Sequence, residues 1–288
     1  MKSVLPIAVV LAVITALWYV AAVWLNAPWI YDQAARANAP APTISQLVPL
    51  TMEQERPVLP TPHQVVRELV KSTFGMKVSS KKSLVYHGWI TISATLLGFA
   101  MGTGLGIVLA IGIIHNRAMD LSVMPWAIAS QTIPILAIAP MIIVVMNSLG
   151  VQGLVPKAII SAFLSFFPVL VGMVMGLRSP DQMQLDLLST YGARPRDVLW
   201  RLRLPSSVPY LFASLKVGIA ASLVGAIVGE LPTGAVAGLG ARLLSGSYYG
   251  QTVQIWAALF AAALVAATLV AIVGVAERGT LRRMGLGR

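Results

Sequence analysis

Residues 89–114 read WITISATLLGFAMGTGLGIVLAIGII, an apolar run without a single charged side chain. A helix needs about 20 residues to cross the hydrocarbon core of a bilayer, so this run predicts a membrane-spanning helix. Within it Gly98, Gly102 and Gly106 recur every four residues and therefore share one face of the helix. Gly225 and Gly229 have the same spacing in a later apolar run. Small residues in register let helices approach closely in lipid, which predicts tight helix packing at both places.

The composition extends this interpretation to the whole chain. The sequence is 57% hydrophobic and 11% charged, with a net charge of +11. Soluble domains are about 45–50% apolar and about 25% charged, so the composition predicts an all-α integral membrane protein. The basic residues flank apolar runs, which favours membrane topology and anionic lipid over nucleic acid as their reason. The absence of cysteine excludes disulfides, thiolate nucleophiles and cysteine-based metal sites.

Six apolar runs are long enough to be predicted as transmembrane helices. The third contains Pro134 and Pro140, which are expected to interrupt it and to expose backbone carbonyls toward a cavity. The six runs are Leu5–Leu25, Trp89–Ile114, Met124–Met146, Pro156–Leu177, Pro209–Glu230 and Thr252–Val275.

The basic residues of the short connections fix the predicted orientation. They concentrate in residues 1–4, 115–120, 178–207 and 277–288, which the positive-inside rule places in the cytoplasm together with both termini. The first run exceeds the length of a signal-peptide core, so it is expected to remain as an anchor.

The predicted organisation has four parts. Residues 1–25 form the anchor, and residues 26–87 form a periplasmic loop with an extended, proline-rich first half and a short interfacial helix near residues 63–72. Residues 88–276 form a five-helix core that contains the cytoplasmic loop 178–207. Residues 277–288 form a basic cytoplasmic tail.

The cytoplasmic loop is the most informative polar segment, and residues 186–205 of it read DLLSTYGARPRDVLWRLRLP. Asp181 and Asp186 are expected near helix starts, where negative charge complements the helix dipole. Gly192 suits a C-terminal cap and Pro195 the first turn of a second short helix. The apolar residues among the following arginines could lie in a groove on another protein or on anionic lipid, or the loop could be a plain cytoplasmic connection.

Few polar residues lie within the spans, and these are candidates for a transport pathway. Glu230, at an apolar helix end, is either a gate or partner-pairing residue or a boundary residue facing lipid headgroups or water. Lys216 either lines a pathway or extends its amine to the cytoplasmic surface. Gln131 and Thr132, with the prolines at 134 and 140, are the remaining pathway candidates.

Catalytic signatures are missing from the sequence. It contains no phosphate-binding loop of the Gly-x-x-x-x-Gly-Lys-Ser/Thr type, no metal-ligand cluster and no legible Ser-His-Asp arrangement. We therefore expect the chain not to be an enzyme on its own and to bind no cofactor or metal.

The cytoplasmic loop resembles the loop of permease subunits in bacterial ABC importers, which reads Glu-Ala-Ala, three residues, Gly, nine residues, Ile-x-Leu-Pro. Here Asp186-Leu187-Leu188 is followed by Gly192 and then by Leu202-Arg203-Leu204-Pro205 at that spacing, although the triplet departs from Glu-Ala-Ala. Four further landmarks are similar to the nitrate, sulfonate and taurine branch of that superfamily. They are Leu59–Pro62, Ile133–Pro140, Phe166–Pro168, and Glu230 followed by Gly238-Leu239-Gly240.

The resemblance implies a type I ABC importer permease in the bacterial inner membrane. Two copies, expected as a homodimer, would form the pore and dock on an ABC ATPase dimer that binds ATP and Mg. A periplasmic solute-binding protein would deliver the solute. The loop residues expected to carry the docking are Asp186, Gly192, Ala193, Arg194, Pro195, Asp197, Leu202, Leu204 and Pro205. Of these, residues 192–194 would lie at the contact, and Pro205 would fix the angle between the loop and the fifth span.

The solute class implied by this branch is a nitrate, sulfonate or taurine-like molecule, or a pyrimidine or other vitamin precursor. The alternative function is a stand-alone secondary carrier or channel. Against that alternative, the spans hold few ionisable groups for ion coupling and no visible inverted repeat of broken helices.

Overall fold

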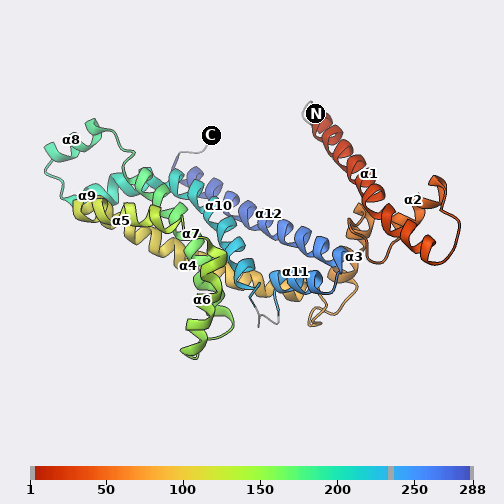
Figure 1. Ribbon diagram of the computed structural model, residues 1–288. Coiled ribbons are helices and arrows are strands. Elements are labelled where there is room, and N and C mark those ends of the chain that lie inside the picture. The colour runs from red at the N-terminus through yellow and green to blue at the C-terminus, as the bar shows by residue number, and fades with distance from the viewer. Residues whose placement is uncertain (1–3, 233–236, 286–288) are drawn as a thin grey trace. The chain divides into compact units, whose positions relative to one another are not determined.

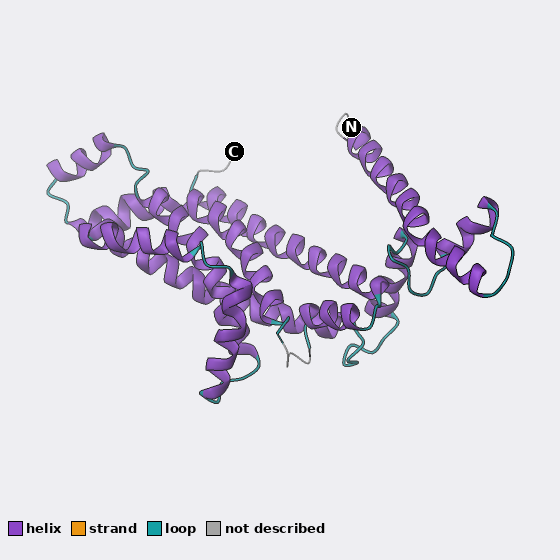
Figure 2. Cartoon of the chain, in the orientation of Figure 1, coloured by secondary structure: helices purple, strands orange, loops and turns teal. Residues whose placement is uncertain are grey.

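The computed structural model describes residues 4–232 and 237–285, and every regular element within them is a helix (Figure 2). A π-helical turn, η1 (Leu199–Arg203), joins α9 to α10. The helices are α1 (Val4–Arg36), α2 (Ile44–Met52), α3 (Pro62–Phe74), α4 (Leu84–His115), α5 (Arg117–Ser130), α6 (Ile135–Ser148), α7 (Leu154–Leu177), α8 (Gln182–Thr190), α9 (Pro195–Val198), α10 (Leu204–Gly229), α11 (Leu239–Tyr248) and α12 (Thr252–Arg283).

Five helical segments of the described chain are long and apolar enough to cross a membrane, and α5 with α6 makes a sixth if that bent pair counts as one span. The fourth predicted span begins within two residues of the observed helix and ends at the same residue, Leu177. The chain divides into two compact units. One holds the residues up to His87 together with Arg242–Ala262, and the other holds Gly88–Ala241 together with the residues from Ala263 onward.

In the first unit, a buried asparagine of α1 holds the segment that precedes α3. The Asn26 carboxamide oxygen accepts the backbone N–H groups of Val58 at 2.8 Å and Leu59 at 3.2 Å, and its nitrogen donates to the Leu59 carbonyl at 2.9 Å. The indole nitrogen of Trp18 donates to the carbonyl of Pro60 at 3.0 Å. The backbone before α3 is therefore fixed to α1 by side chains that can satisfy it away from water.

In the second unit, α7 packs against both α4 and α10, and the closest of these contacts are made by small residues (Figure 1). A Cβ atom at Gly106 of α4 would lie 2.8 Å from the Phe166 carbonyl oxygen of α7. A Cβ atom at Gly225 of α10 would lie 2.7 Å from the Cα atom of Ser161. Those distances are shorter than any real carbon contact, so the backbones approach as closely as only glycine allows.

The other glycines of the two sequence registers have the same orientation. A Cβ at Gly98 would lie 2.5 Å from the Ala158 carbonyl oxygen, and one at Gly102 would lie 2.8 Å from that of Ala162. Gly229 faces Lys157, whose Cα atom would lie 3.2 Å from an added Cβ. Both glycine registers therefore face α7.

The prediction of a third span with two interruptions is wrong in part. The chain bends by 99° between α5 and α6, so Met124–Met146 is not one straight helix (Figure 1). The bend comes at Pro134, which cannot donate a hydrogen bond to the preceding turn. Pro140, in contrast, lies inside α6 without breaking it.

Several predicted boundaries also need correction. The first helix does not end at Leu25 but continues to Arg36, with Pro28 inside it. The helix α2, which contains Pro49, occupies part of the segment expected to be extended. The second predicted span, Trp89–Ile114, belongs to α4, which begins five residues earlier, at Leu84. The last helix runs to Arg283, so most of the described basic tail is helical. Charged residues at helix ends are compatible with helix, and hydropathy alone cannot find where such helices stop.

Candidate functional site

The cytoplasmic loop begins with α8, which is capped at both ends. The Asp181 backbone N–H donates to the side-chain oxygen of Gln184 at 3.3 Å, as in a capping box. At the other end, the Ala193 N–H bonds to the Leu188 carbonyl at 3.0 Å, and Gly192 has a φ of 69°. This geometry is a Schellman motif, whose left-handed position favours glycine. The predicted capping role of Gly192 is confirmed, whereas Asp186 lies in the second turn of α8 rather than at its start.

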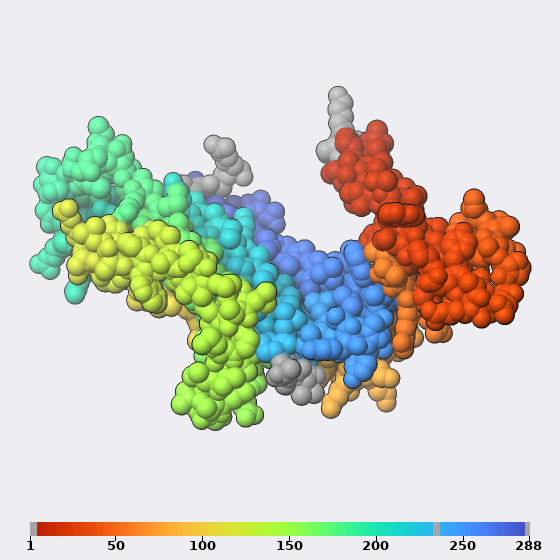
Figure 3. Space-filling view, in the orientation of Figure 1, coloured from red at the N-terminus to blue at the C-terminus, as the bar shows by residue number. Residues whose placement is uncertain are grey.

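One face of α8 is apolar and uncovered. Met183, Leu187 and Tyr191 are spaced four residues apart, and they are 78%, 56% and 80% exposed. None of the residues of α8 is buried. Figure 3 shows the corresponding atoms, residues 182–190, standing out from the neighbouring helices of their unit. We refer to these three residues as the α8 stripe.

The rest of the loop continues directly into the fifth span. Arg194 precedes Pro195, the first residue of α9, and the helical path then runs through η1 into α10 as one span, Pro195–Gly229. Pro205 therefore lies inside one continuous helical path, and not between a separate loop and the span as expected from the sequence. In a regular helix the proline ring would meet the carbonyl of Arg201, but Arg201 belongs to the π-helical turn, where the hydrogen-bond ladder is wider. Pro205 is accommodated as an early residue of α10.

The other loop candidates fall along this continuous helix. Asp197 in α9 forms an exposed ion pair with Arg201, with 3.8 Å between its oxygen and the guanidinium nitrogen. Leu202 and Leu204 are half-buried at the junction of η1 and α10. They belong to the base of the loop, and the α8 stripe belongs to its tip.

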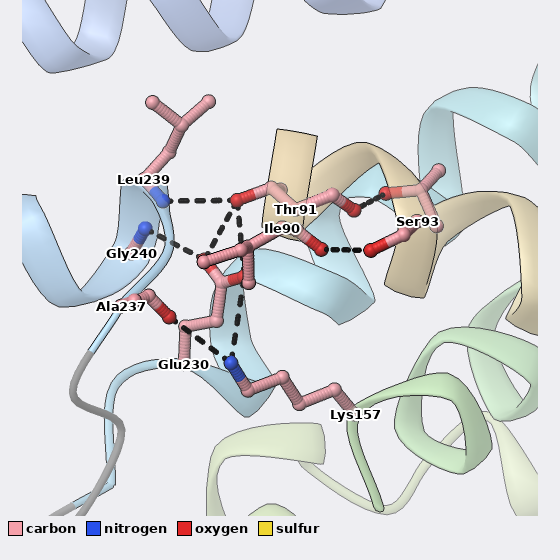
Figure 4. A network of polar contacts seen from close by, with 9 residues as sticks. Ile90, Thr91, Ser93, Lys157, Glu230, Ala237, Leu239 and Gly240 are labelled. Carbon is pink, nitrogen blue, oxygen red and sulfur yellow. Dashed lines mark hydrogen bonds and ion pairs between the residues drawn. The ribbon is translucent and has the colours of Figure 1, made fainter. Parts of the chain in front are cut away.

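At the other end of α10, Glu230 is fully buried within a polar network (Figure 4). The Thr91 hydroxyl of α4 donates to both carboxylate oxygens at 3.0 Å, and it accepts the Leu239 N–H at 2.9 Å. The Gly240 N–H donates to the carboxylate at 2.9 Å. Of the two alternatives for Glu230, the boundary residue facing headgroups or water is wrong, because its carboxylate is enclosed by backbone and hydroxyl donors.

A lysine of α7 completes the Glu230 network. The amine of Lys157 lies 3.8 Å from the Glu230 carboxylate and donates to the carbonyl of Ala237 at 3.1 Å. Gly238 has a φ of 130°, and a Cβ atom there would overlap the carboxyl group of Glu230. The carboxylate therefore joins α4, α7, the end of α10 and the start of α11.

The remaining pathway candidates lie in two separate places. Gln131 and Thr132 are exposed at the bend between α5 and α6, where Pro134 precedes the first residue of α6. Lys216 of α10 forms an ion pair with Glu277 of α12. The residues at the bend and Lys216 are therefore not parts of one polar cluster. The amine of Lys216 is paired with the Glu277 carboxylate, so it does not depend on reaching the cytoplasmic surface alone.

Comparison with known proteins identifies the family. The model of the binding-protein-dependent transport system inner membrane component family matches residues 102–285, which include the α8 stripe and, except for Thr91, the Glu230 network. The chain belongs to this family. It is an inner-membrane permease component of an ABC importer, and the alternative of a stand-alone carrier or channel is set aside.

Two relatives share almost a third of their aligned residues with the permease. It is 31% identical over 183 residues to the formylaminopyrimidine transport permease protein ThiX of Halalkalibacterium halodurans, covering 64% of this chain and 68% of that protein. It is 32% identical over 221 residues to the riboflavin transport system permease protein RibX of Chloroflexus aurantiacus, covering 77% and 78%.

A third relative is more distant. A Bacillus subtilis permease, SsuC, whose name assigns it provisionally to aliphatic sulfonates, is 25% identical over 228 residues, covering 78% of each chain. The permease is thus similar to subunits from several solute systems.

Sequence reasoning missed most of the Glu230 network in this permease. Thr91, Lys157 and the Leu239 N–H come from three places far apart in the sequence, and only the fold brings them to the carboxylate. A usable signal was present in Glu230 itself, because a lone acidic residue after an apolar run must find partners if the end of its helix is buried. Within residues 4–232 and 237–285, no group of three or more His, Cys, Asp or Glu side chains could hold a metal ion.

Proposed function

We propose that the permease docks on its ATPase through the α8 stripe. The observation that carries this proposal is the stripe itself, a row of three exposed apolar side chains on a capped helix that ends a cytoplasmic loop. An amphipathic helix of this kind lies with its apolar face in a groove of a partner. Large exposed apolar side chains in one row are costly in water and mark contact surfaces.

The capped geometry of α8 suits a part that transmits force. Both helix ends carry local capping bonds, which favour a formed α8 before it meets a partner. Gly192, Ala193 and Arg194 adjoin the stripe at its C-terminal end, which is the place expected for the contact.

The membrane pathway is proposed to lie between two copies of the permease. ATP and Mg bind to the separate ATPase subunits, which carry out the hydrolysis, and this chain binds no cofactor. The Gln131–Pro134 bend and Lys216 remain candidates for the surface that faces the solute.

We propose a heterocyclic vitamin or vitamin precursor as the solute. The two relatives that share 31% and 32% of aligned residues are named for formylaminopyrimidine and riboflavin, whereas the sulfonate relative shares 25%. Calorimetry on the purified binding protein of this system tests the choice. Riboflavin and formylaminopyrimidine are compared with taurine, an alkanesulfonate and nitrate, and binding of only the last three would contradict the proposal.

The docking proposal is tested by adding charge to α8. Leu187→Asp places a carboxylate within the stripe, and Ser189→Asp places one on the exposed opposite face of the same helix. We expect the ATPase to co-purify with the Ser189 variant and to be lost from the Leu187 variant. Equal retention of the ATPase by both variants would show that the stripe is not the docking surface.

A further inference from the structure

The base of the cytoplasmic loop is closed by an arginine that caps a neighbouring helix. The Arg203 guanidinium in η1 donates to the carbonyl oxygen of Leu177 at 2.9 Å. Leu177 is the last residue of α7, so its carbonyl has no partner within that helix. A cation at this position also complements the negative end of the helix dipole. One side chain therefore joins the end of the fourth span to the start of the fifth.

A buried leucine reinforces this junction one turn earlier. Leu199, the first residue of η1, is 7% exposed and packs in the same core cluster as Met173 and Leu177 of α7 and Ala127 of α5. Its neighbour Trp200 is 70% exposed, so the π-helical turn directs one side chain inward and the next outward. Arg203 and Leu199 thus hold the same end of α7 by polar and by apolar contact.

The N-terminal segment of the loop starts at the same end of α7. Arg178 follows Leu177 and forms an ion pair with Asp120 of α5, with 2.8 Å between nitrogen and oxygen. This pair is largely exposed, and exposed pairs contribute little to stability. The half-buried Arg203 contact is therefore the stronger polar connection at the base of the loop.

The α8 helix has no such attachment of its own. None of its residues is buried, so a displacement of α8 reaches the membrane helices through the two segments that flank it. Those segments lead to Arg178 on one side and to α9 and η1 on the other. Both routes meet where Arg203 and Leu199 contact the end of α7.

We propose that Arg203 and Leu199 are positioning residues that make the cytoplasmic ends of α7 and α10 move as one body when the ATPase moves α8. The proposal rests on α8 as the docking helix. It assigns to the base of the loop a task distinct from docking, which is to pass on the displacement that the tip receives. Without the junction, α8 would still bind the ATPase, but its movement would be taken up by the loop.

Arg201 supplies a matched control within the same turn. Its side chain is 80% exposed and pairs only loosely with Asp197 at 3.8 Å. Arg201→Gln and Arg203→Gln remove the same charge from the same π-helical turn. A difference between them reports the contact with α7 rather than the charge of the loop.

The experiment uses the permease–ATPase complex in lipid vesicles and needs no solute. The chain has no cysteine, so Leu149→Cys at the exposed end of α6 gives a single thiol reporter. The maleimide labelling rate of this thiol is measured with and without MgATP, using an ATPase partner that binds but does not hydrolyse ATP. We expect MgATP to change the rate in the otherwise native chain and in Arg201→Gln.

In Arg203→Gln we expect the ATPase to co-purify normally while the MgATP-dependent change in labelling falls about tenfold, which corresponds to roughly 1.4 kcal/mol. Arg203→Lys keeps a donor and a charge and should restore part of the response, and Leu199→Ala should weaken the response as Arg203→Gln does. If Arg203→Gln fails to accumulate in membranes, Arg203→Lys and Leu199→Ala are compared with Arg201→Gln instead.

Each other outcome overturns the inference. A native response in the Arg203 and Leu199 variants would show that the junction transmits nothing. Loss of the ATPase from Arg203→Gln would make the residue part of the docking surface, while the α8 proposal would stand. If the otherwise native chain binds the ATPase but its labelling rate does not respond to MgATP, the inference about the junction alone is overturned. If the otherwise native chain does not retain the ATPase, the docking proposal is overturned as well.

Discussion

Replacing Thr91 by valine should destabilise the permease, because this hydroxyl is shared by two buried partners. It donates to the Glu230 carboxylate at 3.0 Å and accepts the Leu239 N–H at 2.9 Å. Valine has the same shape, so the substitution removes these bonds and creates no cavity. A hydrogen bond to a charged group contributes about 1.5–3 kcal/mol, and a buried N–H left without an acceptor costs about 1–3 kcal/mol. Because such terms are not additive, we expect a loss of about 3 kcal/mol.

A second threonine of α4, Thr103, has a buried hydroxyl without a hydrogen-bond partner within the described residues. Thr103→Val removes an unsatisfied buried polar atom, so it should be neutral or stabilise the fold by about 1 kcal/mol. Of the two threonine-to-valine substitutions, only Thr91→Val should therefore lower the stability.

Thermal unfolding of the purified protein in detergent, followed by tryptophan fluorescence, measures both variants. A change of 1 kcal/mol shifts Tm by about 2–4 °C in proteins near this size, so Thr91→Val should lower Tm by about 6–12 °C. Thr103→Val should leave Tm unchanged or raise it by a few degrees. Equal effects of the two substitutions would refute the reasoning, because they would show that the Glu230 network adds nothing to the generic cost of replacing threonine in this helix.

Three further substitutions test the packing and the caps. Gly106→Leu should lower the free energy of unfolding by at least about 3 kcal/mol and abolish accumulation in the membrane, since an added Cβ would lie 2.8 Å from a carbonyl oxygen of α7. The control variant Gly104→Leu, whose side chain would point into open space, should accumulate normally. Asn26→Leu leaves two partly buried N–H groups without their acceptor and should lower Tm by several degrees, whereas Gln33→Leu on the exposed part of α1 should not. Gly192→Ala must adopt a φ of 69°, a cost of roughly 1–2 kcal/mol, and should weaken co-purification of the ATPase by about tenfold, an effect that Gly104→Ala should lack.

Local signals in the sequence predicted the parts of the fold that depend on local chemistry. The registers of Gly98, Gly102 and Gly106 and of Gly225 and Gly229 lie against α7, because four-residue spacing fixes a helix face without reference to the partner. Gly192 ends α8 and Pro195 begins α9, since each residue restricts its own backbone.

The predictions that failed required knowledge of what surrounds a residue. Pro205 was expected to fix the angle between two elements, but it lies within one helical path, where the preceding π-helical turn accommodates the proline ring. Pro134 does bend the chain while Pro140 does not, although both lie in the same apolar run. A proline changes direction only where its lost hydrogen bond is not compensated by neighbours, and the sequence does not record those neighbours.

The partners of Glu230 could be predicted from the sequence even less than the effects of the prolines. Glu230 was conspicuous in the sequence, but its role depended on Thr91, a residue 139 positions earlier. Threonine is unremarkable in a membrane helix because its hydroxyl can bond to the preceding turn, as Thr95 bonds to the carbonyl of Thr91 at 2.7 Å. Nothing local distinguishes the threonine that serves its own helix from the one that serves a distant carboxylate.

The contacts of α7 and α10 restrict where the second unit can change shape. Their outer ends are joined through Lys157 and Glu230, and their cytoplasmic ends through Leu177 and Arg203. Between these points the closest contacts are made by glycine and serine, which have no alternative rotamers large enough to support a second packing arrangement. Relative motion within the unit is therefore expected at the bend between α5 and α6, where Gln131 and Thr132 donate hydrogen bonds to residues 128–130 of α5. A rigid α7–α10 pair driven from α8 would then act on a bend that carries the exposed polar groups expected to face the solute.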